Sequence, residues 1–389
     1  MKKKIIILGS TGSVCKTTLS IIKDKRTFFF IDTLLANKNY KKICFQIINF
    51  KPKNFVVINK KIFLKVKKRF LNKNINIYNS YKNLQNTKKV DITVAAIPGI
   101  EGLEPTIFFA RRSKKILLAN KESVICGWKL IEKLSKTENL KIVPIDSEHF
   151  SIHNLIQNYK KKEIDKIFIT ASGGPFLKTP LNKFKNIKIK DALKHPKWSM
   201  GKKISIDSAT LMNKILELIE AKKIFNFKYS KFKIIIHPQS LVHAIVRFKN
   251  GITKFLYHKP DMVVPISNAI FDNNMNLKDF TTKQKTDENI ESLFFENVDE
   301  KRFPIIKIVP KLNSYVSAPI IINAANEILV DHFLKKKISF ISITKYIFLL
   351  LADKNYKKYA IRATNNLKNI YAVDKWSRNT TLEIIRKHN

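Results

Sequence analysis

Six short apolar runs, separated by segments long enough for helices, occupy the first 145 residues of the chain. Segments such as 13–26 and 102–112 have the length and composition expected of the intervening helices. Continuous apolar strands that alternate with helices are typical of a parallel sheet covered on both faces. The pattern predicts an α/β domain with strands at 3–8, 28–36, 54–59, 91–97, 115–119 and 141–145.

The segment ILGSTGSVCKTTL, residues 7–19, leads from the first predicted strand directly into a predicted helix. Gly9 is placed for a tight turn and Gly12 for close approach to a phosphate, while Cys15 stands where a third glycine is usual. The chain has nine glycines where roughly 7% usage would give about 27, so those that remain mark positions that resist a side chain. The loop therefore predicts a dinucleotide site at the helix N-terminus.

The second predicted strand ends in ANKN, where NAD enzymes commonly carry an acid for the ribose hydroxyl. Lys38 between Asn37 and Asn39 suits a 2′-phosphate instead, which favours NADPH over NADH. The alternative is that Lys38 is one more lysine in a lysine-rich chain.

The rest of the chain changes character. Segments KIFITASGGPF and KIIIHPQSLVHAIVRF predict strands of a second sheet, and the C-terminal part is dominated by helical patterns. The predicted divisions are 1–145, a second domain at 146–271, a connecting arm at 272–297 and a helical domain at 298–389.

The formal charge of +44 is compatible with nucleic-acid binding. However, the lysines are scattered and no nucleic-acid motif accompanies them, which favours compositional drift and no specific nucleic-acid partner. Three distant cysteines predict a reduced, cytoplasmic protein, and the longest apolar run after the first strand, residues 346–352, is too short to span a membrane.

Two carboxylates follow the last predicted strand of the first domain. On an extended segment, Asp146 and Glu148 point to the same side, as a hard-cation site requires. The alternative is a helix N-terminus, with Asp146 capping and Glu148 in the first turn.

A later helix offers a third ligand. Asn213 and Glu217 lie four residues apart on one helix face beside Lys214, and Ser208 is expected near the start of that helix. Glu220 could substitute for Glu217. The alternative is an ordinary amphipathic helix with solvated polar residues and a buried face of Leu211, Ile215, Leu218 and Ile219.

Two further loops have chemical character. Ser172 is followed by two glycines after a predicted strand, which suits a phosphate or a metal-bound oxygen. His195, Trp198, Met200 and Gly201 lie together in HPKWSMGKK, which indicates a lid over a hydride acceptor. The histidines of HPQSLVH, at 237 and 243, are interpreted as structural.

Nine collinear segments resemble the 1-deoxy-D-xylulose 5-phosphate reductoisomerase family. They run through nearly the whole chain in the order GSTGSV, ANKN, LLANKES, PIDSEH, SGGPF, HPKWSMGKKISIDSATLMNK, HPQSLVH, PDMVVPI and NAANE. The resemblance implies a homodimer whose chains carry a Rossmann-like NADPH domain, an α+β catalytic domain and a C-terminal helical domain.

The resemblance also implies the site. It implies a Mn²⁺, Mg²⁺ or Co²⁺ site at Asp146, Glu148 and Glu217, with Lys121 also catalytic. The implied positions for the phosphorylated sugar substrate are Ser147, Ser172, His195, Trp198, Ser208, Asn213 and Lys214. The implied cofactor positions are Thr11, Gly12, Ser13, Val14, Asn37, Lys38, Asn39, Asn120, Glu122, Met200 and Gly201.

The implied reaction is rearrangement of 1-deoxyxylulose 5-phosphate and reduction by NADPH to 2-C-methyl-D-erythritol 4-phosphate, a step toward isoprenoids. The chain departs from the family pattern at glycine positions now held by Cys15, Asn37, Ile215 and His258, and at an arginine position now held by Val263. Because asparagine tolerates positive φ and cysteine is small, we expect the cofactor loop to persist. Ile215 is expected either to crowd the site or to stiffen its helix.

Overall fold

The computed structural model describes residues 2–84, 88–198, 200–276, 280 and 292–388. Its internal contacts divide the chain into two compact units. The expected division into four segments stays a prediction, and residues 277–279 and 281–291 of the expected arm lie outside the described residues. The first unit comprises Met1–Ser123, Leu130–Phe150 and Met262–Glu288, and the second comprises Val124–Lys129, Ser151–Asp261 and Asn289–Asn389.

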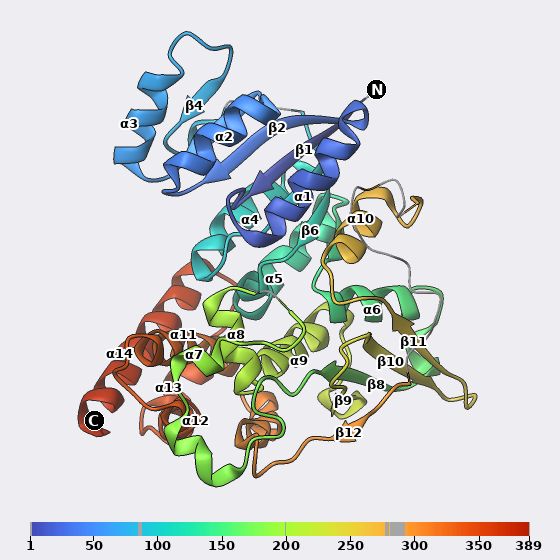
Figure 1. The fold of residues 1–389 in the computed structure, drawn as a ribbon, viewed down its shortest axis with the longest axis vertical. Coiled ribbons are helices and arrows are strands. Elements are labelled where there is room, and N and C mark those ends of the chain that lie inside the picture. The colour runs from blue at the N-terminus through green and yellow to red at the C-terminus, as the bar shows by residue number, and fades with distance from the viewer. Residues whose placement is uncertain (1, 85–87, 199, 277–279, 281–291, 389) are drawn as a thin grey trace. The chain divides into compact units, whose positions relative to one another are not determined.

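The first unit contains a seven-stranded sheet of order β4-β3-β2-β1-β5-β6-β7 in which every recorded pair is parallel (Figure 1). All six strands expected from the sequence are confirmed. The seventh was missed because it is a three-residue edge strand without an apolar run. The bounds are β1 Lys3–Leu8, β2 Phe29–Ala36, β3 Asn54–Val57, β4 Asn76–Tyr78, β5 Val90–Ala95, β6 Ser113–Leu118 and β7 Lys141–Pro144.

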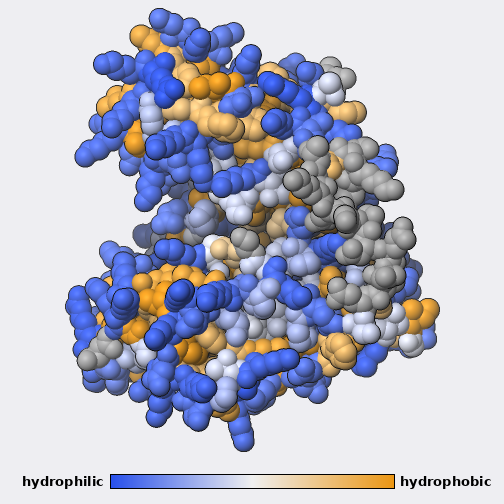
Figure 2. Space-filling view, viewed as in Figure 1, coloured by the Kyte–Doolittle hydropathy of each residue, from blue (hydrophilic) through white to orange (hydrophobic). Residues whose placement is uncertain are grey.

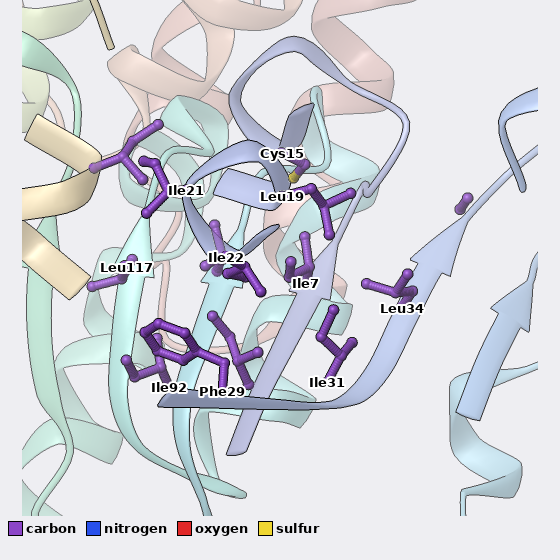
Figure 3. Packing of buried hydrophobic residues seen from close by; sticks show 14 of the residues in the cluster. Ile7, Cys15, Leu19, Ile21, Ile22, Phe29, Ile31, Leu34, Ile92 and Leu117 are labelled. Carbon is purple, nitrogen blue, oxygen red and sulfur yellow. The ribbon is translucent and has the colours of Figure 1, made fainter. Parts of the chain in front are cut away.

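The core of the first unit is built by apolar residues from segments that are distant in sequence. Helices α1 (Ser13–Asp24) and α10 (Val263–Phe271) contact each other. Figure 3 shows Leu19, Ile21 and Ile22 of α1 beside apolar side chains of the strands. Buried Lys115 donates from Nζ to the Ala269 carbonyl oxygen at 2.9 Å and pairs with Asp272 at 2.9 Å. A cation at a helix C-terminus is favourable, so Lys115 fixes α10 to the sheet.

The second unit contains a mixed five-stranded sheet of order β11-β10-β8-β9-β12. Strands β8 and β9 pair in parallel, whereas the other recorded pairs are antiparallel. The strands expected from KIFITASGGPF and KIIIHPQSLVHAIVRF are confirmed. The bounds are β8 Ile164–Ala171, β9 Phe232–Ile236, β10 Val242–Phe248, β11 Thr253–Tyr257 and β12 Glu296–Asn297.

The C-terminal part of the second unit is helical, as expected, with α11, α12 and α14 in mutual contact (Figure 1). Within the described residues, no helix combines the length and the apolar content that crossing a bilayer requires. The bounds are α11 Ala318–Leu334, α12 Phe340–Leu351, α13 Tyr356–Ala360 and α14 Leu367–His388.

Hydrophilic side chains are widely distributed over the visible face. Figure 2 shows them over most of the described part of that face, interrupted by apolar patches. The interpretation of the +44 charge as compositional drift stays a prediction.

Candidate active site

The glycine loop of the first unit has a backbone that only glycine fits. Gly9 has φ of 80°, and a side chain there would place its first carbon 2.7 Å from the Ala96 carbonyl oxygen. The backbone N–H groups of Gly9 and Ser10 both donate to the Leu35 carbonyl oxygen at 2.9 Å, which closes the turn against β2. Gly12 is the N-cap of α1 and provides no side-chain cap. The first N–H groups of α1 are therefore available to an anion.

Cys15 occupies the space that the missing third glycine would leave between α1 and β1. Its thiol is fully buried in the core and donates to the Leu8 carbonyl oxygen at 3.4 Å (Figure 3). Burial raises the pKa of the Cys15 thiol, so the sulfur stays protonated. The side chain faces the core and does not prevent the turn at Gly9 from closing.

The segment after β2 contains one residue that caps a helix and one that is exposed at the surface. Asn37 does not adopt positive φ, so the left-handed conformation that was considered for it is not needed. Asn39 caps α2 (Tyr40–Phe50), where its Oδ1 accepts from the Lys42 N–H at 3.1 Å. Lys38 is exposed and could reach a ligand. Lys42 Nζ donates to the Thr11 carbonyl oxygen at 3.3 Å, which joins this segment to the glycine loop.

The predicted cofactor residues Asn120 and Glu122 are both buried and bonded to each other at 3.2 Å. Asn120 also caps α5 (Lys121–Thr137) and donates to the Ile97 carbonyl oxygen. These bonds give Asn120 a structural role beside its predicted contact with the cofactor.

The expectation that Asp146 and Glu148 lie on an extended segment is wrong. Strand β7 ends at Pro144, and α6 (Ser147–Ile156) begins with Glu148 in its first turn. The Phe150 N–H donates to the Asp146 carbonyl oxygen at 2.8 Å, the bond that opens a helix. The helix alternative is therefore the observed one, and the carboxylates lie at a helix N-terminus, where negative charge is favoured.

A lysine and a histidine of the first unit lie beside Asp146. Lys121 Nζ lies 3.4 Å from its Oδ2, and His149 Nδ1 lies 3.2 Å from its Oδ1. Sequence reasoning missed His149, which is fully buried. Its position three residues after Asp146 on a helix was the available signal. A histidine ring N–H that faces a carboxylate can hold it in one orientation, so His149 is placed to orient Asp146.

Helix α9 (Met212–Phe225) carries the polar set expected from its spacing. Asn213 Nδ2 donates to Glu217 Oε1, and Lys214 Nζ lies 2.7 Å from Glu217 Oε2. Lys214 and Glu217 are buried, so the alternative of solvated polar residues is wrong. Ile215 is fully buried as well, and the predicted apolar face is confirmed at Leu211, Ile215, Leu218 and Ile219.

A glycine-rich loop brings Ser172 against another helix, α8 (Lys202–Ala209). Gly174 has φ of 65°, and a side chain there would place its first carbon 3.0 Å from the Ser208 carbonyl oxygen. The Gly174 N–H donates to Ser172 Oγ at 3.1 Å. Ser208 lies in the last turn of α8, and α9 begins at Met212, so Ser208 precedes the later helix and is not part of its first turn.

His195 joins the Ser172 loop to the lid segment. Its Nδ1 accepts from the Trp198 N–H at 2.9 Å, so the neutral ring carries its proton on Nε2, 2.9 Å from Ser172 Oγ. Burial and the nearby Lys214 ammonium lower the pKa of His195 to about 4. The ring is therefore neutral at physiological pH.

The interpretation of the HPQSLVH histidines as structural is confirmed for His237. Its Nε2 accepts from the Leu241 and Val242 N–H groups at 3.2 Å each. His243 stacks on His258 with ring centroids 3.9 Å apart, and Trp198 meets His243 edge-on at 6.0 Å. His258, a departure from the family pattern, thus forms one side of a ring stack that reaches Trp198, in the segment predicted to be a lid.

The second unit thus gathers hydroxyl, amide, imidazole and ammonium groups, which are donors suited to a phosphate. The first unit gathers carboxylates with a lysine, and carboxylate oxygens suit a hard divalent cation.

The sequence matches three family patterns. They are described as 1-deoxy-D-xylulose 5-phosphate reductoisomerase over residues 5–127, its C-terminal domain over 142–225, and DXP reductoisomerase C-terminal domain over 258–380. A relative from Pelagibacter ubique named 1-deoxy-D-xylulose 5-phosphate reductoisomerase is 46% identical over 95% of this chain and 96% of its own length. A relative of the same name from Wolbachia of Brugia malayi is 38% identical over 99% and 98%.

Solved structures agree. A DOX-P reductoisomerase in complex with NADPH, fosmidomycin and magnesium is 31% identical, has a TM-score of 0.91, and is matched over 99% of this chain and 98% of its own. The Zymomonas mobilis 1-deoxy-D-xylulose 5-phosphate reductoisomerase in complex with NADPH is 30% identical, with a TM-score of 0.86 and 99% of both chains covered. The chain belongs to the 1-deoxy-D-xylulose 5-phosphate reductoisomerase family.

Proposed function

We propose that this chain converts 1-deoxy-D-xylulose 5-phosphate to 2-C-methyl-D-erythritol 4-phosphate with NADPH and a divalent metal, in isoprenoid biosynthesis. The observation that carries the proposal is the buried polar set of α9, in which Lys214 and Asn213 both hold Glu217. Charged groups are rarely buried without a partner or a ligand to serve. Family membership supports the same reading.

NADPH, which supplies the hydride, is held in this proposal by the glycine loop. The fit is geometric, because Gly9 excludes any side chain and the uncapped start of α1 offers N–H groups to the pyrophosphate. Lys38, exposed after β2, binds the 2′-phosphate. Thr11, Ser13 and Val14 flank the pyrophosphate, and Met200 and Gly201 contact the nicotinamide end.

The metal, as Mn²⁺, Mg²⁺ or Co²⁺, supplies Lewis-acid stabilisation of oxygen charge when bound. Its proposed ligands are Asp146, Glu148 and Glu217, and an all-carboxylate set fits such cations. Lys121, beside Asp146, is placed to orient that carboxylate and to stabilise negative charge on the substrate.

The substrate phosphate is bound by side chains of the second unit. Lys214 provides the charge, Asn213 an amide, and Ser208 and Ser172 hydroxyl groups. His195 donates from Nε2 toward Ser172 and holds its hydroxyl in place. Anchoring the phosphate remotely orients the reacting carbons, and the lid with Trp198 excludes water.

The chain is further proposed to act as a cytoplasmic homodimer. The family resemblance supports the dimer, and the three scattered cysteines, none of which is in a disulfide, support a reducing compartment.

The test is NADPH oxidation with 1-deoxy-D-xylulose 5-phosphate, with and without Mn²⁺, for the wild type and Glu217→Gln. We expect metal-dependent oxidation in the wild type and a loss of about 100-fold or more in the variant, because removing one partner from a buried charge network costs several kcal/mol. Glu383→Gln, an exposed acid on α14, is the matched control and should retain activity. A folded wild type that binds NADPH but does not oxidise it with this substrate would refute the proposal.

A further inference from the structure

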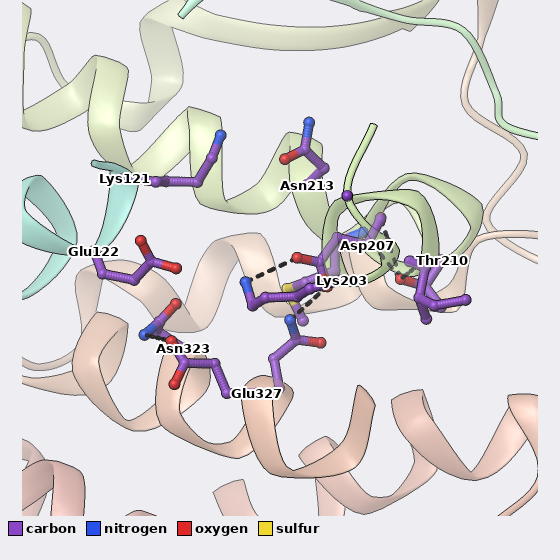
Figure 4. A network of polar contacts seen from close by, with 12 residues as sticks. Lys121, Glu122, Lys203, Asp207, Thr210, Asn213, Asn323 and Glu327 are labelled. Atoms are coloured by element: carbon purple, nitrogen blue, oxygen red, sulfur yellow. Dashed lines mark hydrogen bonds and ion pairs between the residues drawn. The ribbon is translucent and has the colours of Figure 1, made fainter. Parts of the chain in front are cut away.

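Asp207 is a buried carboxylate in α8, one residue before Ser208, and only 1% of its surface is exposed. Its two oxygens have different partners. Lys203 Nζ, one turn earlier on α8, lies 2.9 Å from Oδ2, and Asn326 Nδ2, on α11, donates to Oδ1 at 2.7 Å (Figure 4). The carboxylate therefore joins α8 to a helix 119 residues further along the chain.

The network of Asp207, Lys203 and Asn326 is not expected to contribute much to the stability of the fold. Buried ion pairs gain little over apolar residues of the same size, because the cost of desolvating the charges offsets their attraction. Asn326 is itself fully buried, and within the described residues its Oδ1 has no hydrogen-bond partner. The buried contact between Asp207 and Asn326 therefore fixes the position of α8 against α11 and adds little to the stability of the fold.

The backbone between Asp207 and α9 is conformationally restricted. Thr210 Oγ1 donates toward the Ile206 and Asp207 carbonyl oxygens, at 3.1 and 3.2 Å, and ends α8. Leu211 follows with φ of 65°, a strained conformation for a branched residue, and α9 begins immediately after it. A shift of Asp207 would therefore move both Ser208 and the start of α9, which carries Lys214.

Asp207 directly precedes Ser208, so its charge bears on any anion that Ser208 binds. A carboxylate adjacent to a phosphate repels it strongly at low dielectric unless a cation offsets the charge. Lys203, of which 31% of the side chain is exposed, is the cation placed to do so.

We propose that Asp207, Lys203 and Asn326 form a positioning network for the substrate phosphate. Asn326 fixes the last turn of α8, and with it the hydroxyl of Ser208, while Lys203 cancels the carboxylate charge beside the phosphate. The network acts through Ser208 and Lys214 and does not touch the substrate. The inference rests on the proposed function, since it assumes that these two residues bind phosphate.

The main test compares Asn326→Asp, Asp207→Asn and the double variant. Asn326→Asp places two carboxylates together, and we expect KM for 1-deoxy-D-xylulose 5-phosphate and the Kd for inorganic phosphate to rise about 10-fold or more, as for loss of a charged hydrogen bond. The Kd for NADPH should not change. The double variant restores one carboxylate and one amide, and should recover most of the loss.

A second test avoids the buried pair in case those variants do not fold. Lys203→Met should raise the Kd for inorganic phosphate several-fold, because the Asp207 charge is then uncompensated. Lys202→Met, the adjacent and exposed residue on the same helix, removes the same charge and should leave phosphate binding unchanged.

Lys214→Met separates failure of this inference from failure of the proposed function. If Lys214→Met weakens phosphate binding while Asn326→Asp and Lys203→Met change only thermal stability, the network is structural and the inference is wrong. If Lys214→Met also leaves phosphate binding intact, the proposed phosphate site itself is wrong.

Discussion

The glycine loop of the first unit and the phosphate-binding set of the second are both proposed to hold phosphate groups, but they are built from different parts. The loop uses backbone, with Gly9 in a left-handed conformation and an uncapped helix start. The second site uses buried side chains, with Lys214 and Glu217 paired at 2.7 Å. Backbone sites tolerate replacements that point away from the ligand, as Cys15 does, whereas sites made of side chains depend on every partner.

Lys214→Met should have the largest effect, because it removes the phosphate's cation and leaves Glu217 buried without that partner. We expect kcat/KM to fall by about 100-fold or more, measured by steady-state kinetics with circular dichroism to confirm folding. Lys222→Met, in the last turn of the same helix, is the control. Equal losses in the two variants would contradict a specific role for Lys214.

Gly9→Ala tests the backbone site. Its φ of 80° and the 2.7 Å approach to the Ala96 carbonyl oxygen should together lower stability and weaken NADPH binding. Gly251 has φ of 89° but open space around it, so Gly251→Ala should cost only the conformational strain, about 1–2 kcal/mol. Chemical denaturation would measure the stability of each variant, and NADPH fluorescence titration would measure its binding of the cofactor. Equal effects of Gly9→Ala and Gly251→Ala would mean that the close approach of Gly9 to Ala96 is unimportant.

Cys15→Gly introduces the glycine that the family pattern has at this position, but it should not strengthen NADPH binding. Loss of a buried side chain and a more flexible helix should lower the free energy of unfolding by about 1–2 kcal/mol. Because Cys15 faces the core, the Kd for NADPH should change by less than about threefold. A much tighter Kd would show that the cysteine does perturb the loop.

The smallest effect concerns pH. The folded-state pKa of His195 is lowered from 6.5 to about 4, so the unfolded chain binds a proton more readily between these values. The stability contributed by neutral His195 is complete above pH 6.5 and is lost as the pH falls toward 4. His195→Gln should flatten this part of the stability curve in urea titrations. An unchanged slope would contradict the lowered pKa.

Several features followed from the sequence because they depend on local pattern. The alternation of apolar runs and helices indicated the parallel sheet, since it records which segments are buried on both faces. The spacing of Asn213 and Glu217 placed them on one face of α9, as the structure confirms. Nine collinear motifs indicated the family.

Other features needed the tertiary structure. The helix start at Asp146 was not readable from spacing, because two carboxylates two apart fit a strand or a helix N-terminus equally well. The burial of Lys214 and Glu217 could not be predicted from the sequence either, since a polar helix face is solvated or buried according to what packs against it.

The sequence by itself determined the sheet, the helix registers and the family, because periodicity and short motifs are properties of neighbouring residues. The tertiary structure alone decided which polar groups meet, as when Asn326 donates to Asp207, 119 residues away in the sequence. It also decided which unit a segment belongs to, as when residues 262–271 become part of the first unit. The physical reason is that a local pattern specifies which side of an element is buried but not the partner against which it is buried.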